Sequence, residues 1–271
     1  MISMDTATLK ERVLTSAQKH REEFSKITSG FEDRGILNSE MLAACSLAED
    51  LGVEVFIESG RWLGQSTEIL ARYFENKPVI VESIEAFHDA NALHVEKKLQ
   101  GKKNLRLLYG DANLVVPRLV KKYHGKKIAL LFDGPKGRAA LDVFRLSLTL
   151  HDDVSVGFFH DMRQPTEEMP NRSRSEMDSV FPESFYTDDT DFVREFSEVD
   201  AGCDTALWRP YAIDGKKIGS YGPTLGIVVP EEKDRRKAQD EKWGIRLRMT
   251  KQVLNLFAVK TYHWIRRIAG K

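Results

Sequence analysis

Five short apolar runs, separated by segments of helical periodicity, constrain the fold of this 271-residue chain more than any other feature. The runs span residues 55–57, 78–84, 104–109, 127–132 and 154–159. Each run is nearly continuous, which is typical of a strand buried on both faces of a parallel sheet. Two later runs, at 205–208 and 224–229, are separated by glycine turns and predict a closing antiparallel hairpin. We therefore expect an α/β fold with a mostly parallel seven-stranded sheet and helices on both faces.

The remaining segments predict how the chain is organised around this sheet. Residues 1–50 have helical apolar spacing and predict a helical cover. Residues 51–230 hold all the strands and form the predicted α/β domain. Within it, residues 162–203 are rich in Arg, Ser, Asp, Glu and Pro, which predicts an irregular insertion over the ligand site. Residues 231–271 predict a basic helical extension.

The end of this extension combines positive charge with apolar and aromatic side chains. From position 249 onward it contains no acid, and its basic residues are Lys251, Lys260, Arg266, Arg267 and Lys271. A helix of this type can contact an anionic membrane surface peripherally, pack on its own domain, or pack on a second subunit of a homodimer. The sequence leaves these three interpretations open.

Composition limits the classes of partner. The formal net charge is zero, so the chain as a whole has no attraction for nucleic acid. Cys45 and Cys203 lie outside any CxxC or Cys/His cluster, which indicates neither a structural zinc site nor a disulfide framework. No signal-peptide core and no apolar run of membrane-spanning length is visible, so we expect a cytoplasmic protein.

An acidic residue lies at or just after the end of each of the first five runs. These residues are Glu58, Glu85, Asp111, Asp133 and Asp161. In open parallel sheets, ligands bind in the crevice outside the carboxyl ends of the strands. The repeated placement of an acid at this edge therefore predicts a ligand site there.

A glycine turn follows the first run and narrows the class of ligand. Gly60 and Gly64 bracket three bulky residues, and the helix that follows has free N–H groups that face a ligand. Glu85 lies 25 positions after Gly60, where a carboxylate can bind ribose hydroxyls. The spacing is GxxxG, not the GxGxxG of dinucleotide sites, and Glu58 before the turn would repel a pyrophosphate. A nucleoside with a cationic sulfonium and an amino-acid tail matches better, and Asp111 is placed to contact its adenine amino group.

Residues 53 to about 161, with the terminal strands to about 229, resemble class I S-adenosylmethionine-dependent methyltransferases. The motif ESGRWLGQST at 58–67 resembles that of small-molecule and sugar O-methyltransferases, as do the strings LLFDGPKGRAALDVFRLSL and VGFFHDM. The resemblance implies a Rossmann-like fold that binds S-adenosyl-L-methionine. The implied cofactor contacts are Gly60 and Gly64 at the turn, Glu58 at the methionine end, Ser66 and Thr67 at its carboxylate, Glu85 at the ribose, Asp111 with Ala112 at the adenine, and Asp133 beside them.

The resemblance also implies candidates for the reaction itself. Some family members bind a divalent ion with acids at the ends of strands four and five, and Asp133 with Asp161 matches those positions, which implies Mg²⁺. The acid or histidine pair that often follows the first of these acids is replaced here by residues 134–136 (Gly-Pro-Lys). Methyl transfer to a hydroxyl requires alignment and removal of a proton. His160 is the predicted base beside Asp161, and Lys136 is a second candidate that could also hold an anionic substrate.

The sequence thus predicts an S-adenosylmethionine-dependent methyltransferase, with O-methylation of a small molecule or a glycan sugar. One alternative is a dinucleotide-dependent oxidoreductase, against which the GxxxG spacing argues. A nucleic-acid methyltransferase is opposed by the zero net charge and the absence of an NPPY-type loop. A non-catalytic cofactor-binding module on the same fold stays open, because fold does not fix function.

Overall fold

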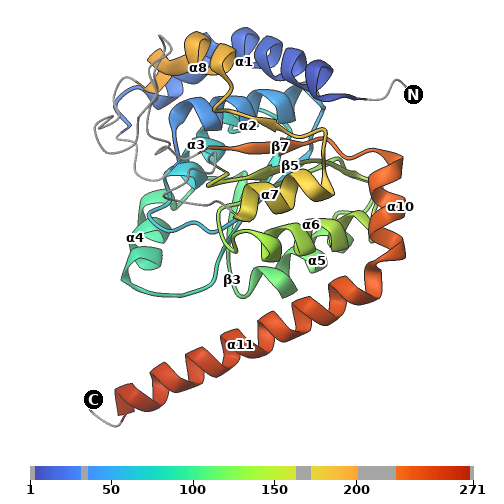
Figure 1. The fold of residues 1–271 in the computed structure, drawn as a ribbon. Coiled ribbons are helices and arrows are strands. Elements are labelled where there is room, and N and C mark those ends of the chain that lie inside the picture. The colour runs from blue at the N-terminus through green and yellow to red at the C-terminus, as the bar shows by residue number, and fades with distance from the viewer. Residues whose placement is uncertain (1–3, 32–35, 163–171, 201–223, 269–271) are drawn as a thin grey trace, which may run out of the picture.

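The computed structural model describes residues 4–31, 36–162, 172–200 and 224–268. At its centre lies a seven-stranded sheet with the order β3-β2-β1-β4-β5-β7-β6 (Figure 1). The strands are β1 (Val55–Ser59), β2 (Ile80–Glu85), β3 (Leu105–Tyr109), β4 (Ile128–Phe132), β5 (Val154–Phe159), β6 (Phe185–Tyr186) and β7 (Gly226–Val228). The pairs from β3 to β5 are parallel, whereas β7 is antiparallel to both β5 and β6. The predicted Rossmann-like, mostly parallel sheet with an antiparallel end is confirmed.

The chain reverses its direction of travel across the sheet between β1 and β4. It proceeds from β1 through β2 to β3 on one side, then crosses to β4 and β5 on the other. β1 and β4 are buried at every position because helices cover both of their faces. The carboxyl ends of these neighbouring strands diverge into different loops, and this is where open α/β sheets form their ligand crevice.

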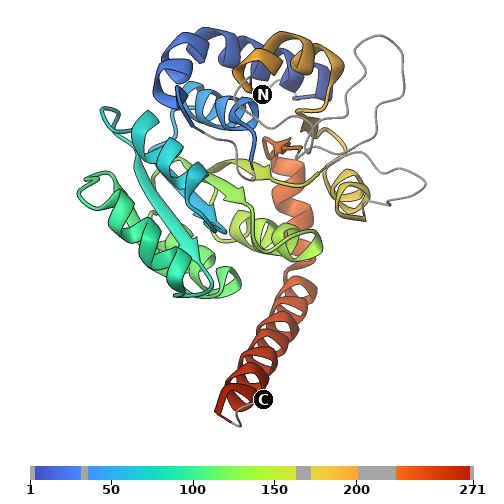
Figure 2. The same cartoon turned by 90° about the vertical axis from the view of Figure 1, so that its left-hand side faces the viewer.

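Helices form a layer on each face of the sheet (Figure 2). One apolar core joins the sheet to α1 (Thr6–Thr28), α2 (Asn38–Asp50), α3 (Gln65–Tyr73) and α8 (Thr190–Phe196). A second core on the opposite face joins it to α5 (Ala112–Lys122), α6 (Arg138–Leu148), α7 (Arg172–Val180), α10 (Glu232–Asp240) and α11 (Lys242–Ile268). The helix α4 (Ala90–Leu99) connects β2 to β3. In the described part of the predicted N-terminal cover, residues 6–28 and 38–50 are helical.

The segment predicted to be irregular contains regular elements, which corrects that prediction. Its described part, residues 172–200, forms α7, β6, α8 and the 3-10 helix η1 (Ser197–Asp200). The high content of charged residues concealed widely spaced apolar side chains, of which Met177, Phe192 and Phe196 are buried. The strand that pairs with β7 is β6, whereas the hairpin partner predicted at 205–208 lies outside the described residues.

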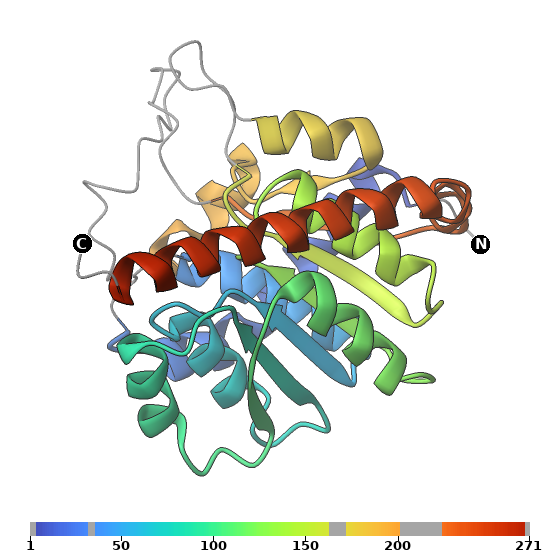
Figure 3. The ribbon, with the colours of Figure 1, turned by 90° about the horizontal axis from the view of Figure 1, so that it is seen from below.

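The C-terminal helix α11 extends across the molecule as a single long rod (Figure 3). Its first turns pack on α6 through the buried side chains of Ile245 and Met249. Among the described residues, no helix is long and apolar enough to cross a membrane. The described part of the predicted C-terminal extension thus forms two helices, α10 and α11, and α11 begins on the domain itself.

Candidate active site

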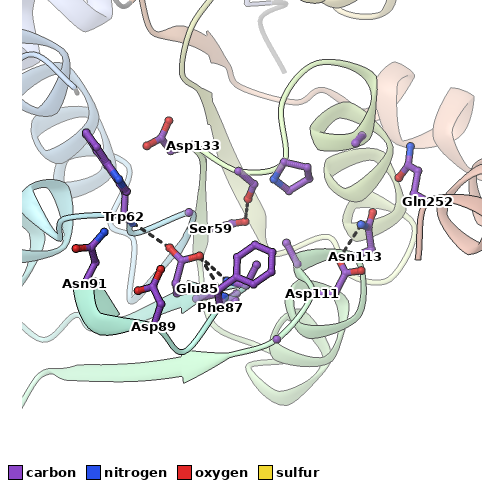
Figure 4. Close-up of a pocket in the computed structure, with 18 residues that line it drawn as sticks. Ser59, Trp62, Glu85, Phe87, Asp89, Asn91, Asp111, Asn113, Asp133 and Gln252 are labelled. Atoms are coloured by element: carbon purple, nitrogen blue, oxygen red, sulfur yellow. Dashed lines mark hydrogen bonds between the residues drawn. The ribbon is translucent and has the colours of Figure 1, made fainter. Parts of the chain in front are cut away.

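A cavity of about 530 Å³ lies at the carboxyl ends of β1 to β4 (Figure 4). This volume is within the range of small-molecule sites, roughly 300–1,000 Å³. Its lining consists of Ser59, Gly60, Trp62, Ile84, Glu85, Ala86, Phe87, Asp89, Asn91, Gly110, Asp111, Ala112, Asn113, Asp133, Gly134, Pro135, Ala139 and Gln252. Of the acids predicted at the strand ends, Glu85, Asp111 and Asp133 line this cavity, and Glu58 and Asp161 do not.

The glycine turn after β1 is held against both neighbouring strands. Gly60 donates its backbone N–H to the carbonyl of Ile84 at 2.9 Å, and Ser59 accepts from the N–H groups of Asp133 and Gly134 at 2.8 Å. Gly60 has a φ of +92°, and a Cβ added there would lie 2.4 Å from the backbone nitrogen of Gly134. Only glycine satisfies both the positive φ and this close approach, so the turn can form one wall of the cavity.

The carboxylate of Glu85 lies against the concave side of this turn. Its Oε2 accepts backbone N–H hydrogen bonds from Arg61 at 3.0 Å and Trp62 at 2.9 Å, and its Oε1 accepts one from Ala86 at 2.7 Å. Backbone N–H groups in such a turn are the donors that a bound phosphate would need. Because a carboxylate already takes them, the turn presents negative charge to the cavity.

Glu58 occupies a different position from the one predicted. Its side chain is fully buried behind the turn, where it accepts hydrogen bonds from the hydroxyls of Ser66, Thr67 and, at 2.6 Å, Ser83. Burial raises the pKa of Glu58 above its usual value. The predicted direct contact of Glu58, Ser66 and Thr67 with the cofactor is therefore corrected: these residues fix the turn to the start of α3.

Gly64 also acts through packing. It has a φ of +77°, and a Cβ there would lie 2.6 Å from the side chain of Val95 on α4. Gly64 does not line the cavity, so the structure gives it a role in bringing α3 close to α4 in place of the predicted ligand contact.

The far end of the cavity is formed by the start of α5. Asp111 caps this helix, with its Oδ1 accepting from the backbone N–H of Asn113 at 2.9 Å and from the Asn113 side-chain amide at 2.8 Å. Asp111 Oδ2 and Asn113 Oδ1 are buried without a hydrogen-bond partner. Ala112 lines the cavity between them. Two acceptor atoms without donors therefore lie at the end of the cavity where the sequence predicts adenine.

Several lining residues were absent from the sequence-based prediction. Asp89 and Asn91 lie near Glu85 at one end of the cavity, and Asn113 and Gln252 lie near Asp111 at the other (Figure 4). Asp89 had a local signal, because an Asp before a helical segment is a typical N-cap, and it accepts from Ala92 N–H at 3.0 Å. Gln252 had none, since it comes from the distant helix α11.

A charged cluster shares Asp133 with the cavity. His160 Nδ1 lies 2.6 Å from Asp133 Oδ1, and the Lys136 ammonium contacts Asp133 and lies 2.7 Å from Asp161 Oδ2. On the other side of the imidazole, His160 Nε2 lies 3.6 Å from Oε2 of the buried Glu40 on α2. The structure therefore brings together all three predicted catalytic residues and adds a third carboxylate to them.

Neighbouring carboxylates favour the protonated form of both candidate bases in this cluster. Burial alone would lower the pKa of His160, but Asp133 and Glu40 raise it to about 10. Burial likewise opposes the charge on Lys136, but Asp133 and Asp161 raise its pKa above the usual value. An imidazolium and an ammonium cannot accept a proton at neutral pH. This arrangement therefore favours both residues as cations and disfavours the predicted role of either one as the general base.

The same cluster bears on the predicted Mg²⁺ site. Ligand atoms of Asp133, His160 and Asp161 lie within 4.8 Å of one another, which is close enough to surround an ion. However, the Lys136 ammonium contacts both carboxylates and lies 3.2 Å from His160 Nδ1. Mg²⁺ also requires near-octahedral oxygen coordination. Because an internal cation already lies between the carboxylates, Asp133 and Asp161 do not fit a divalent ion here.

Comparison with known proteins finds solved structures of low similarity. No protein-family model and no curated protein matches the sequence. Among solved structures, the O-methyltransferase TomG from Streptomyces achromogenes, in complex with S-adenosylmethionine, is similar with a TM-score of 0.43 and 17% identity over 82% of this chain and 90% of that one. An O-methyltransferase from Bacillus cereus has a TM-score of 0.42 and 16% identity, over 80% of this chain and 91% of that one. Geranyl diphosphate C-methyltransferase from Streptomyces coelicolor has a TM-score of 0.40 and 14% identity, over 68% of this chain and 74% of that one. At this level of similarity the function has to be inferred from the site itself.

Proposed function

We propose that this protein is an S-adenosylmethionine-dependent methyltransferase that O-methylates a small molecule or a glycan sugar. The observation that carries the proposal is the charge of the cavity. Its described lining includes the carboxylates of Glu85, Asp89, Asp111 and Asp133 and no Lys, Arg or His side chain. A site of this charge favours a ligand that is cationic and rich in N–H and O–H donors. A sulfonium nucleoside with an amino-acid tail has both properties.

The structure disfavours the dinucleotide alternative on separate grounds. A pyrophosphate would need the backbone N–H groups of the turn, and those of Arg61 and Trp62 are held by Glu85. It would also lie beside the carboxyl groups of Glu85, Asp89 and Asp111, and the described lining contains no Lys, Arg or His side chain to bind it. Glu85 retains acceptor capacity for ribose hydroxyls, because a carboxylate has about four lone-pair sites.

The charged cluster supports a catalytic role over a non-catalytic binding module. In methyl transfer the acceptor oxygen attacks the methyl carbon in line with the breaking carbon–sulfur bond, so alignment is the main requirement. The Lys136 side chain is 43% exposed beside the cavity wall at Asp133, so its ammonium can donate to an acceptor hydroxyl. A cation at this point lowers the pKa of the hydroxyl and stabilises the developing anion. We assign the proton to Asp161, whose side chain is 55% exposed and whose pKa, in spite of burial, is held below its usual value by His160 and Lys136.

Calorimetry with S-adenosylhomocysteine tests the cofactor assignment. We expect one molecule to bind per chain, with an affinity unchanged by millimolar Mg²⁺ and by its removal with a chelator, because Lys136 holds the cation position. Absence of binding would eliminate the methyltransferase proposal. A large effect of Mg²⁺ on the affinity would contradict the role of Lys136 as the cation of the site, but it would leave the cofactor assignment standing. Transfer of a labelled methyl group from the cofactor to a hydroxyl-bearing acceptor then separates an enzyme from a binding module.

We further propose that the outer face of α11 contacts an anionic membrane surface, as a peripheral site for a cytoplasmic enzyme. Trp243, Leu247 and Leu254 are 80%, 74% and 64% exposed, and their spacing places them on one side of the helix. The exposed bases Arg246 and Lys251 flank them. Apolar side chains bordered by positive charge suit the interface of an anionic bilayer.

Vesicle sedimentation checks this proposal. We expect the protein to bind vesicles that contain phosphatidylserine more tightly than phosphatidylcholine vesicles, and to lose most of this binding in the double variant Trp243→Ser and Leu247→Ser. The matched control is Leu93→Ser, which alters an exposed apolar residue on α4 and should leave binding unchanged. Equal binding by the double variant would exclude this face, and a dimer in light scattering that the double variant abolishes would assign it to a second copy of the chain.

A further inference from the structure

The C-terminal helix α11 is fixed to the domain by one of its faces. Arg248 donates two hydrogen bonds to Asp142 of α6, at 2.8 Å from Nε to Oδ2 and 2.7 Å from Nη2 to Oδ1. Asp142 is fully buried, and such a bidentate pair sets both the register and the orientation of the helix. Ile245 and Met249 pack into the core on the same face.

Gln252 continues this face one turn further and reaches the cavity. It lies four residues after Arg248 and seven after Ile245, so it points toward the domain and away from the exposed side of Trp243. Gln252 lines the cavity on the same side as Asn113 (Figure 4). The long helix thus contributes a polar side chain to a site that is otherwise built from the strand ends.

The amide oxygen of Gln252 has no partner. Gln252 Oε1, Asn113 Oδ1 and Asp111 Oδ2 are each buried without a hydrogen bond, and all three residues line the same end of the cavity. Buried acceptors without donors cost roughly 1–3 kcal/mol each, so a group of three indicates a ligand that supplies N–H donors. Asp111 and Asn113 are already bonded to each other through their remaining atoms.

The surroundings of these acceptors suit a flat heterocycle. Ala112, Pro135 and Phe87 supply apolar contacts, and Phe87 is 51% exposed where it borders the cavity. Exposed aromatic rings of this kind provide stacking surfaces for nucleobases. Adenine carries an amino group with two N–H donors beside a ring nitrogen acceptor, and a carboxamide can bind this pair in a bidentate manner.

We infer that Gln252 of α11 binds the nucleobase of the cofactor and makes the site selective for adenine. The inference rests on the proposed function and extends it, because the recognition residue lies outside the sheet domain. A base with a carbonyl in place of the amino group would set an oxygen against three acceptor oxygens and would be rejected. The C-terminal helix is then part of the cofactor site as well as a structural extension.

Calorimetry with S-adenosylhomocysteine and S-inosylhomocysteine tests this inference on the full-length protein. We expect the wild type to prefer the adenosyl compound by about 10-fold or more. Gln252→Leu should weaken binding of the adenosyl compound by about 10-fold and leave binding of the inosyl compound within about 3-fold, so that the preference shrinks. Asn255→Leu is the matched control, because it removes an exposed amide from the same helix and should change neither affinity.

Hydrogen exchange provides a second readout that a purely structural role would not move. Amides of α11 around Gln252 should become protected when S-adenosylhomocysteine binds the wild type, and this protection should be lost in Gln252→Leu although the variant remains folded by circular dichroism. An unchanged preference in Gln252→Leu would overturn the inference while leaving the methyltransferase proposal intact. Failure of the wild type to bind either compound would instead overturn the proposed function on which it rests.

Discussion

Replacing Glu85 by Ala is expected to reduce the affinity for S-adenosylhomocysteine by at least about 100-fold. The carboxylate holds the backbone N–H groups of Arg61, Trp62 and Ala86, so its loss leaves three donors at the glycine turn without an acceptor. Hydrogen bonds to a charged group are each worth roughly 1.5–3 kcal/mol. The variant also loses the acceptor assigned to the ribose hydroxyls. Calorimetry measures the affinity directly.

Two variants show whether this loss is specific. Glu85→Gln keeps one side-chain oxygen as an acceptor, so its affinity should lie between those of the wild type and Glu85→Ala. Glu54→Ala removes an exposed glutamate that pairs with Lys126 near the opposite end of β1, and its affinity should equal that of the wild type. If Glu85→Ala is folded and binds as tightly as the wild type, the cavity is not the cofactor site.

The features that the sequence predicted correctly follow from short-range patterns. The parallel strands β1 and β4 follow nearly continuous apolar runs, because both of their faces are covered, and polar residues follow where the strands end. Glu85 and Asp111 are located in this way, by their place after β2 and β3. The requirement for glycine at Gly60 is equally local, since it arises from a tight turn with positive φ. The sheet and the general position of the cavity were therefore predictable.

The features that the sequence could not supply depend on contacts between distant segments. Glu58 and Glu85 are the same residue type at the ends of neighbouring strands, but the hydroxyls of Ser66, Thr67 and Ser83 hold Glu58 away from the cavity. No spacing rule distinguishes the two positions. Gln252 is one polar residue among many in a charged helix, and only the docking of α11 on α6 brings it to the site.

Protonation states belong to the same class of unpredictable features. His160 beside Asp161 resembles a base in the sequence, but Glu40 from α2 and Asp133 from the end of β4 convert it into a cation. The pKa of a side chain depends on burial and on every charge near it, and Glu40 lies far from His160 along the chain. The identity of the proton acceptor therefore follows from the fold, and not from the residue type alone.

This cation should be one of the largest contributors to stability in the site. His160→Gln is expected to lower the free energy of unfolding by about 3 kcal/mol at pH 6, because it leaves the buried Glu40 without its positive partner and leaves Asp133 with Lys136 alone. Urea unfolding followed by circular dichroism measures this change. His94→Gln, which alters an exposed histidine on α4, should remain within about 0.5 kcal/mol of the wild type.

The dependence of this difference on pH distinguishes charge from packing. Folding raises the pKa of His160 from about 6.5 to about 10, so its stabilisation is fully present below pH 6.5 and is lost as the pH rises toward 10. Unfolding of the wild type and His160→Gln at pH 6, 8 and 10 should therefore show a difference that narrows steadily as the pH increases. A difference that stays constant across this range would mean that His160 is neutral and acts only by packing, which would restore it as a candidate general base.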